Sequence, residues 1–311
     1  MQNLRLFTGS TGLNTRIDPA RLMFDPESGI QELAAAVNVD VDDSGRVSRT
    51  KGYTKIATGS FHSLFCDKGP ALVVTGDALC ILNTDYTLTP LRNVTVGAKM
   101  TYAQVDDVVY YANGYETGKI QNELSYAWEY TGERVGPETD REFSSPPVGS
   151  IVRHYKGRMY VVQRQNVWYS EPYDHSAFDM ARNLLPFESD VKMFCPMETG
   201  VYVSDSNHVY FLEGEAFKED FFRKKPKLYY PAVPGTEDYV TGMLDLSDRN
   251  SPSMVPGVGQ MYAVFVTTKG VCVGSPDGDI FNLTEAKIDY PVGASGCGIV
   301  LNNRYISMIN P

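Results

Sequence analysis

The chain has 311 residues, a formal net charge of −10 at pH 7 and a sequence pI of about 4.9. This acidity excludes a basic groove for nucleic acid, because Lys and Arg supply most of the affinity for phosphate groups. The length allows one large all-β domain or two ordinary domains. With 12% aromatic residues, 27 Gly and 18 Pro, the composition suits half-buried strands joined by turns. We therefore expect an all-β protein.

The five cysteines are odd in number, widely spaced and free of any CxxC pair. Several lie within apolar alternation, which favours small buried hydrophobic residues over disulfide or zinc ligands. The N-terminus lacks the apolar run of a signal peptide, and no stretch reaches the roughly 18 apolar residues that span a bilayer. We expect a protein made in the cytoplasm with no membrane contact.

The first part of the chain contains one predicted hairpin. Residues 1–30 are irregular because Gly and Pro interrupt any period. Val37, Val39 and Val41 then alternate with polar residues, residues 42–45 read Asp-Asp-Ser-Gly, and residues 46–49 alternate back. This pattern predicts two antiparallel strands around a tight turn.

A short phrase then recurs along the chain: alternating apolar residues, a tight polar turn, and alternating apolar residues again. Its four copies begin at Gly69, Gly157, Thr199 and Lys269. Each copy predicts an antiparallel hairpin with one buried face. A single hairpin cannot bury that face alone, so its repetition predicts sheets packed radially around an axis. The leading architecture is a β-propeller.

The expected blades are small, antiparallel and unevenly spaced. They lie near residues 60–93, 98–122, 148–178, 190–222, 258–285 and 294–309. We expect five to seven blades within residues 59–311, with an insertion near 223–257 of extra outer strands or a protruding loop. We expect residues 1–58 to form an extension that contacts neighbouring subunits or closes the propeller, and we expect ring closure to pair an early strand with the last blade.

The sequence motifs that indicate catalysis or metal binding in other proteins are incomplete in this chain. Asp40–Gly45 resembles the first half of a calcium loop, but Lys51 stands where the bidentate Glu is needed. Ser275–Phe281 resembles one imperfect Asp-box, which is a structural turn. The four histidines lack metal-ligand spacing, and no nucleophile motif is present. We expect no catalytic residue, no cofactor and no metal.

One basic segment with aromatic neighbours stands out. Residues 221–230 read Phe-Phe-Arg-Lys-Lys-Pro-Lys-Leu-Tyr-Tyr. It is interpreted as a solvated edge strand, since lysines there discourage unwanted strand pairing. A contact with another protein is favoured over a contact with DNA.

Two phrases resemble a known family. The opening GSTGLNTR, followed by ELAAAVNVDVDDSGRVSRTKGYTKI, resembles the start of tail hub, or nozzle, proteins of short-tailed bacteriophages, the tail tubular protein B type and related DNA-stabilisation proteins. The positions that match their pattern are Gly12, Asn14, Asn38, Gly45, Val47, Arg49 and Gly52. The phrase from His154 to Asp179 resembles a propeller blade of the same proteins. Its matching positions are Gly157, Arg158, Trp168, Tyr169, Ser170, Glu171, Pro172, Phe178 and Asp179.

The resemblance implies a non-enzymatic structural protein in the virion tail, synthesised in the host cytoplasm. It implies a homo-oligomeric ring, commonly a hexamer, that prolongs the DNA channel and docks a connector or adaptor and a tail fibre or spike. DNA would pass without specific binding along an acidic wall. Two alternatives stay open: a propeller glycan-binding or glycan-cleaving tail protein, and a cellular scaffold propeller.

Overall fold

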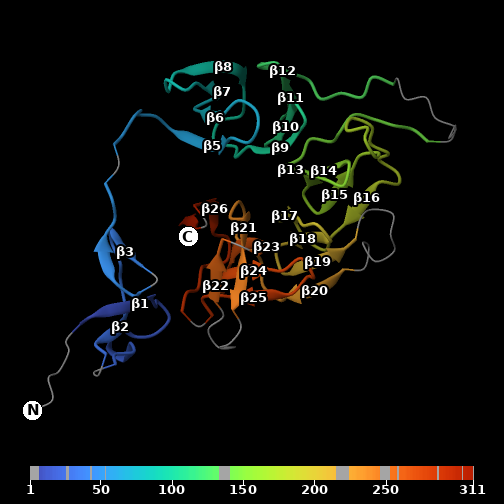
Figure 1. The fold of residues 1–311 in the computed structure, drawn as a ribbon. Helices are drawn as coiled ribbons and strands as arrows, with labels where there is room; N and C mark the ends of the chain where they lie inside the picture. Colours follow the sequence, from blue (N-terminus) through green and yellow to red (C-terminus); the bar gives the residue numbers. More distant parts are fainter. Residues whose placement is uncertain are drawn as a thin grey trace, which may run out of the picture. The chain divides into compact units, whose positions relative to one another are not determined.

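The computed structural model describes residues 7–25, 28–42, 44–52, 54–132, 141–214, 224–245, 253–257, 259–285, 287–302 and 304–310. In these ranges the regular structure consists of β-strands and one short 3₁₀ helix, η1 (Pro19–Arg21) (Figure 1). The chain divides into two compact units. One comprises residues 56–232 and 276–278, and the other comprises residues 1–55, 233–275 and 279–311. The all-β prediction is confirmed.

The unit of residues 56–232 contains four successive antiparallel sheets of four strands each. The first holds β5 (Phe61–Phe65), β6 (Leu72–Thr75), β7 (Ala78–Leu82) and β8 (Leu88–Asn93). The second holds β9 (Thr101–Val105), β10 (Val108–Ala112), β11 (Thr117–Gln121) and β12 (Leu124–Tyr126). The third holds β13 (Ile151–Tyr155), β14 (Arg158–Gln163), β15 (Asn166–Tyr169) and β16 (Leu184–Pro186). The fourth holds β17 (Met193–Pro196), β18 (Gly200–Ser204), β19 (Val209–Glu213) and β20 (Lys225–Leu228).

Within each of these sheets the strands follow their order in the chain, which is the meander of a propeller blade. The first strands of the second, third and fourth sheets also lie next to each other, because β13 contacts both β9 and β17. Sheets that meet at their first strands are arranged radially. This unit therefore has the blade topology of a β-propeller, as the repeated hairpins predict.

The repeated phrase forms the middle hairpin of three of these sheets, β6–β7, β14–β15 and β18–β19. Its aligned residues Val73, Val161 and Val203 are at most 5% exposed. The apolar core lies between successive sheets rather than within one: clusters join the first sheet to the second, the second to the third and the third to the fourth. Full burial of one such side chain stabilises the fold by about 1.5–3 kcal/mol.

The other unit contains a five-stranded sheet in the order β22-β21-β23-β24-β25 and a two-stranded sheet of β26 and β27. The strands are β21 (Asp238–Asp245), β22 (Ser253–Pro256), β23 (Gln260–Thr267), β24 (Gly270–Gly274), β25 (Ile280–Asn282), β26 (Ser295–Leu301) and β27 (Arg304–Asn310). The fourth copy of the phrase forms β24–β25. The sheet expected at 258–285 therefore begins earlier, at β21, and β20 completes the sheet expected at 190–222. In its described part, segment 223–257 supplies strands to two sheets.

The extension folds into two small sheets. Strands β1 (Gly9–Leu13) and β2 (Ile30–Leu33) pair in parallel, and β3 (Val39–Val41) pairs with β4 (Val47–Arg49) in the predicted antiparallel hairpin. Among the described strands, β26 and β27 pair only with each other, so the expected pairing of an early strand with the last blade is wrong. The division of the chain at residue 58 stays a prediction.

Candidate functional site

The first motif cluster is built around the buried side chain of Asn14. Its Nδ2 donates to Oε2 of Glu32 at 3.1 Å, and its Oδ1 accepts from the backbone N–H of Arg16 at 3.2 Å. The backbone N–H of Asn14 donates to the carbonyl of Leu33 at 2.9 Å. These bonds fasten the end of β1 to β2, so Asn14 has a structural role.

Close backbone contact explains the glycine at position 45. The N–H of Ser10 donates to the carbonyl of Gly45 at 2.7 Å, which joins β1 to the turn between β3 and β4. A Cβ on Gly45 would lie 3.0 Å from the carbonyl oxygen of Ser10, and its φ of +79° lies in the left-handed region. Gly12, with φ of +105°, occupies an irregular position of β1.

The remaining positions of the first phrase do not join this cluster. Asn38 has a φ of +55° and accepts from the N–H of Thr50 at 3.0 Å, so it shapes the start of the hairpin. Arg49 and Gly52 are exposed. Sequence reasoning did not identify Glu32 as the partner of Asn14, because β1 and β2 meet only in the folded chain.

The second motif cluster lies in the third sheet around Arg158, which is 6% exposed. Its Nη1 donates to the carbonyl of Ser170 at 2.6 Å, and its guanidinium lies 5.7 Å from the ring centroid of Tyr169. Burial lowers the pKa of Arg158 and raises the pKa of Tyr169. The fully buried Ser170 hydroxyl accepts from the N–H of Met159 at 3.0 Å and donates to the carbonyl of Glu171.

The preceding turn contacts the loop between β15 and β16. Gly157 has a φ of +74°, and its carbonyl accepts from the N–H of Tyr173 at 2.7 Å. A Cβ at this position would lie 2.9 Å from the Tyr173 ring. Pro172 is exposed and takes no part in the cluster. The segment from His154 to Asp179 therefore contains one tight turn, one buried arginine and the loop to which both are hydrogen-bonded.

A buried ion network completes this cluster. Arg141 forms ion pairs with Glu171 and, at 2.9 Å, with Asp179. Asn183 Nδ2 also donates to Glu171 Oε1 at 2.7 Å. The side chains of the two acids are only 4% and 3% exposed, and that of Arg141 is 11% exposed. No sequence pattern pointed to Arg141, which is 30 residues from Glu171 in the chain.

The arrangement of the second cluster suits rigidity rather than catalysis. Both carboxylates are engaged by Arg141, and the Ser170 hydroxyl is fully buried and hydrogen-bonded to backbone groups. The fragment of a calcium loop is an ordinary turn, because Asp42 Oδ1 accepts from Ser44 and from the N–H of Arg46. These hydrogen bonds lower the pKa of Asp42. Across the described ranges, no group of three or more His, Cys, Asp or Glu side chains is placed to hold a metal ion.

Two histidine rings contact each other near the loop between β15 and β16. The rings of His154 and His175 lie 5.3 Å apart at their centroids in an edge-to-face contact, and Tyr110 contacts His175. Burial lowers the pKa of both imidazoles, and the neighbouring His175 further lowers that of His154. Both shifts favour the uncharged form of the two imidazoles.

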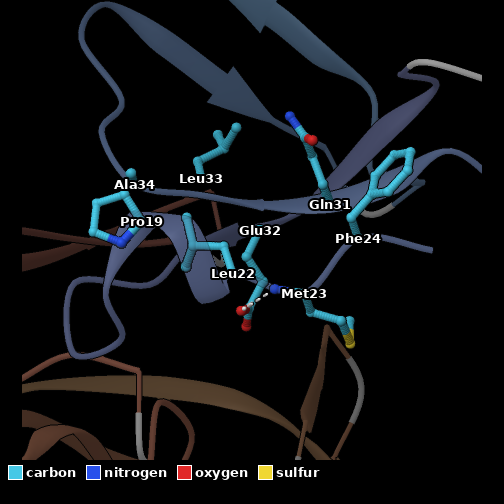
Figure 2. A pocket seen from close by; sticks show the side chains of 8 residues that line it. All are labelled: Pro19, Leu22, Met23, Phe24, Gln31, Glu32, Leu33 and Ala34. Atoms are coloured by element: carbon cyan, nitrogen blue, oxygen red, sulfur yellow. Dashed lines mark hydrogen bonds between the residues drawn. The ribbon is translucent and has the colours of Figure 1, made fainter. Parts of the chain in front are cut away.

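The extension contains an open pocket of about 370 Å³. Figure 2 shows its lining: Pro19, Leu22, Met23, Phe24, Gln31, Glu32, Leu33 and Ala34. Six of these eight side chains are apolar, and Glu32 is the only charged one. Its Oε2 accepts from Asn14 and, at 3.4 Å, from the N–H of Met23. The pocket thus combines apolar side chains with a largely polar surface and a fixed carboxylate.

The comparisons show no family. No family model matches the chain, and no curated protein matches it. The chain is similar to the extracellular domain of a putative hybrid two-component system from B. thetaiotaomicron, with 10% identity and a TM-score of 0.44 over 76% of this chain and 29% of that one. It is also similar to Hsv2 of Kluyveromyces lactis (8% identity, TM-score 0.38, 92% of this chain and 86% of that one) and to the AfRom2 CNH domain (9%, 0.37, 78% and 69%).

The chain thus spans about 29% of the first of these structures. At such scores the similarities carry no argument about function, and the propeller assignment rests on the sheet topology described above. Within the described part of the chain, no helix has the length and hydrophobicity needed to cross a bilayer.

Proposed function

We propose that this chain is a non-enzymatic structural subunit of a tailed-phage virion, which forms a ring at the tail hub or nozzle. The ring would extend the DNA channel, dock a connector and carry a fibre or spike. The resemblance of the two phrases to tail hub proteins supports this role. The roles of Asn14, Gly45, Arg158 and Ser170 support it further, because each of them holds one backbone segment against another.

The observation that carries the proposal is the lack of an apolar core in the extension. Among the described residues 7–55, the buried ones are Gly9, Ser10, Asn14 and Gly29. Several large apolar side chains are exposed instead, including Met23 at 55% and Val37 at 79%. Ordering the backbone costs about 1–2 kcal/mol per residue, which burial of apolar surface normally offsets. Association with neighbouring subunits would supply that burial.

Native mass spectrometry of the full chain, alone and with a phage connector, tests the proposal. A closed oligomer, or assembly on the connector, is the expected result. A chain that stays monomeric in both experiments refutes it. A chain that binds or hydrolyses a polysaccharide would instead support the glycan-directed alternative.

A further inference from the structure

We infer that the pocket of the extension receives a basic edge strand, β20, from a second copy of this chain. This inference rests on the proposed ring assembly and names the contact that would build it. It combines two features of the described structure: a pocket with one carboxylate, and exposed lysines on an unpaired strand edge.

The pocket has the chemistry that a lysine side chain requires. A lysine combines a long apolar stem with a cationic head. The side chains of Leu22 and Met23, which lie beside the Glu32 carboxylate, would cover the stem (Figure 2). Both hydrogen bonds to Glu32 reach Oε2, so Oε1 takes none within the described residues and can accept from an ammonium group.

The carboxylate is held in place before any partner arrives. The buried Asn14 amide and the backbone N–H of Met23 both donate to it, which fixes its position between Leu22 and Met23. A preorganised acceptor loses little side-chain entropy when it binds a partner.

Strand β20 supplies the complementary charge. Among the described strands it pairs only with β19, and it forms the outer edge of its sheet. Lys225 and Lys227 are exposed and, two residues apart on a strand, point to one face. Lys224 is already engaged by the carbonyl of Pro186 and by the ring of Phe187, with its Nζ 4.7 Å from the ring centroid.

The edge of β20 is unsuited to adding another strand, because Pro226 lacks an N–H donor. A contact through side chains is therefore favoured over strand addition. Since pocket and lysines are different surfaces of one chain, their contact between copies is head-to-tail. Such contacts close into rings when the rotation between subunits permits.

Charge exchange tests this contact in the full-length chain. Glu32→Lys should weaken self-association by about tenfold or more, since it would place like charges together. Lys225→Glu with Lys227→Glu should weaken it similarly. All three changes together should restore association towards the wild-type level. Dissociation constants come from sedimentation velocity over a range of protein concentrations, alone and on a phage connector.

Matched variants control for folding and for net charge. Glu32→Gln keeps an acceptor for Asn14 and removes only the charge, so it should weaken association without lowering the thermal midpoint. Glu129→Gln and Lys68→Glu change exposed side chains outside the pocket and β20 and should leave association unchanged.

The outcomes separate this inference from the proposed function. If the wild-type chain forms rings but the combined charge exchange restores nothing, the pocket contact is wrong and the ring assembly stands. If the wild-type chain stays monomeric alone and with the connector, both are wrong. Restored association in the combined variant supports both.

Discussion

Replacement of Arg141 by methionine tests the buried ion network of the third sheet. The change removes the Arg141 cation that pairs with two carboxylates, Glu171 and Asp179, in a site where they are only 4% and 3% exposed. Removing one partner of a buried ion pair costs about 3–5 kcal/mol, because the remaining charge stays desolvated. For a unit of this size, each kcal/mol lowers the melting temperature by about 2–4 °C. We therefore expect a loss of about 10 °C.

Thermal and urea unfolding followed by circular dichroism measure this effect. Arg164→Ala is the matched control, since that arginine is exposed and its replacement should change stability little. A double variant, Arg141→Met with Asp179→Asn, removes both charges of one ion pair. It should be more stable than the single variant, because Glu171 keeps the neighbouring charge of Arg158 and the hydrogen bond from Asn183. A single variant that loses less than about 1 kcal/mol, the scale of exposed ion pairs, would refute the reasoning.

Three further predictions concern the same unit. Gly157→Ala should destabilise it by about 1–3 kcal/mol in urea unfolding, because the new Cβ meets the Tyr173 ring at a positive φ, and an unchanged midpoint would contradict this. Phe194→Ala should cost about 3–5 kcal/mol, since its fully buried ring stacks on Tyr160. Stability should also fall as pH drops below 6.5: the folded-state pKa values of His154 and His175 are lowered, so the unfolded chain binds more protons there. In His175→Gln the decrease in urea midpoint between pH 7.5 and pH 5 should be smaller.

Much of the second motif cluster was visible in the sequence, because its residues are close in the chain. Gly157, Arg158, Tyr169 and Ser170 belong to one hairpin and its following loop, so a single phrase contains them. The structural role of these four residues could not be predicted from the sequence. It depends on Arg141, which reaches the loop from another segment and pairs with acids 30 and 38 residues away in the chain.

In the N-terminal cluster, too, contacts between segments far apart in the chain could not be predicted. The hairpin of β3 and β4 follows from valine alternation around an Asp-Ser-Gly turn, and it forms as predicted. The parallel pairing of β1 with β2 has no local pattern, and with it the Asn14–Glu32 hydrogen bond and the pocket beside it could not be anticipated. The basic segment near residue 225 was predicted to be an edge strand, and β20 is the outer strand of the fourth sheet, but its pairing with β19 was not predicted.

The sequence by itself determined the all-β class and the repeated hairpins, because alternation and turn residues act between neighbours in the chain. Alternation predicts one buried face for each hairpin, which is wrong for the central strand β14: it is buried on both faces, because its sheet packs against the second and the fourth sheet. Only the tertiary structure decided which strand completes each sheet, which charges share a buried site and where a carboxylate lines a pocket. Those features depend on backbone groups and side chains brought together over tens of residues, and no local pattern encodes such distances.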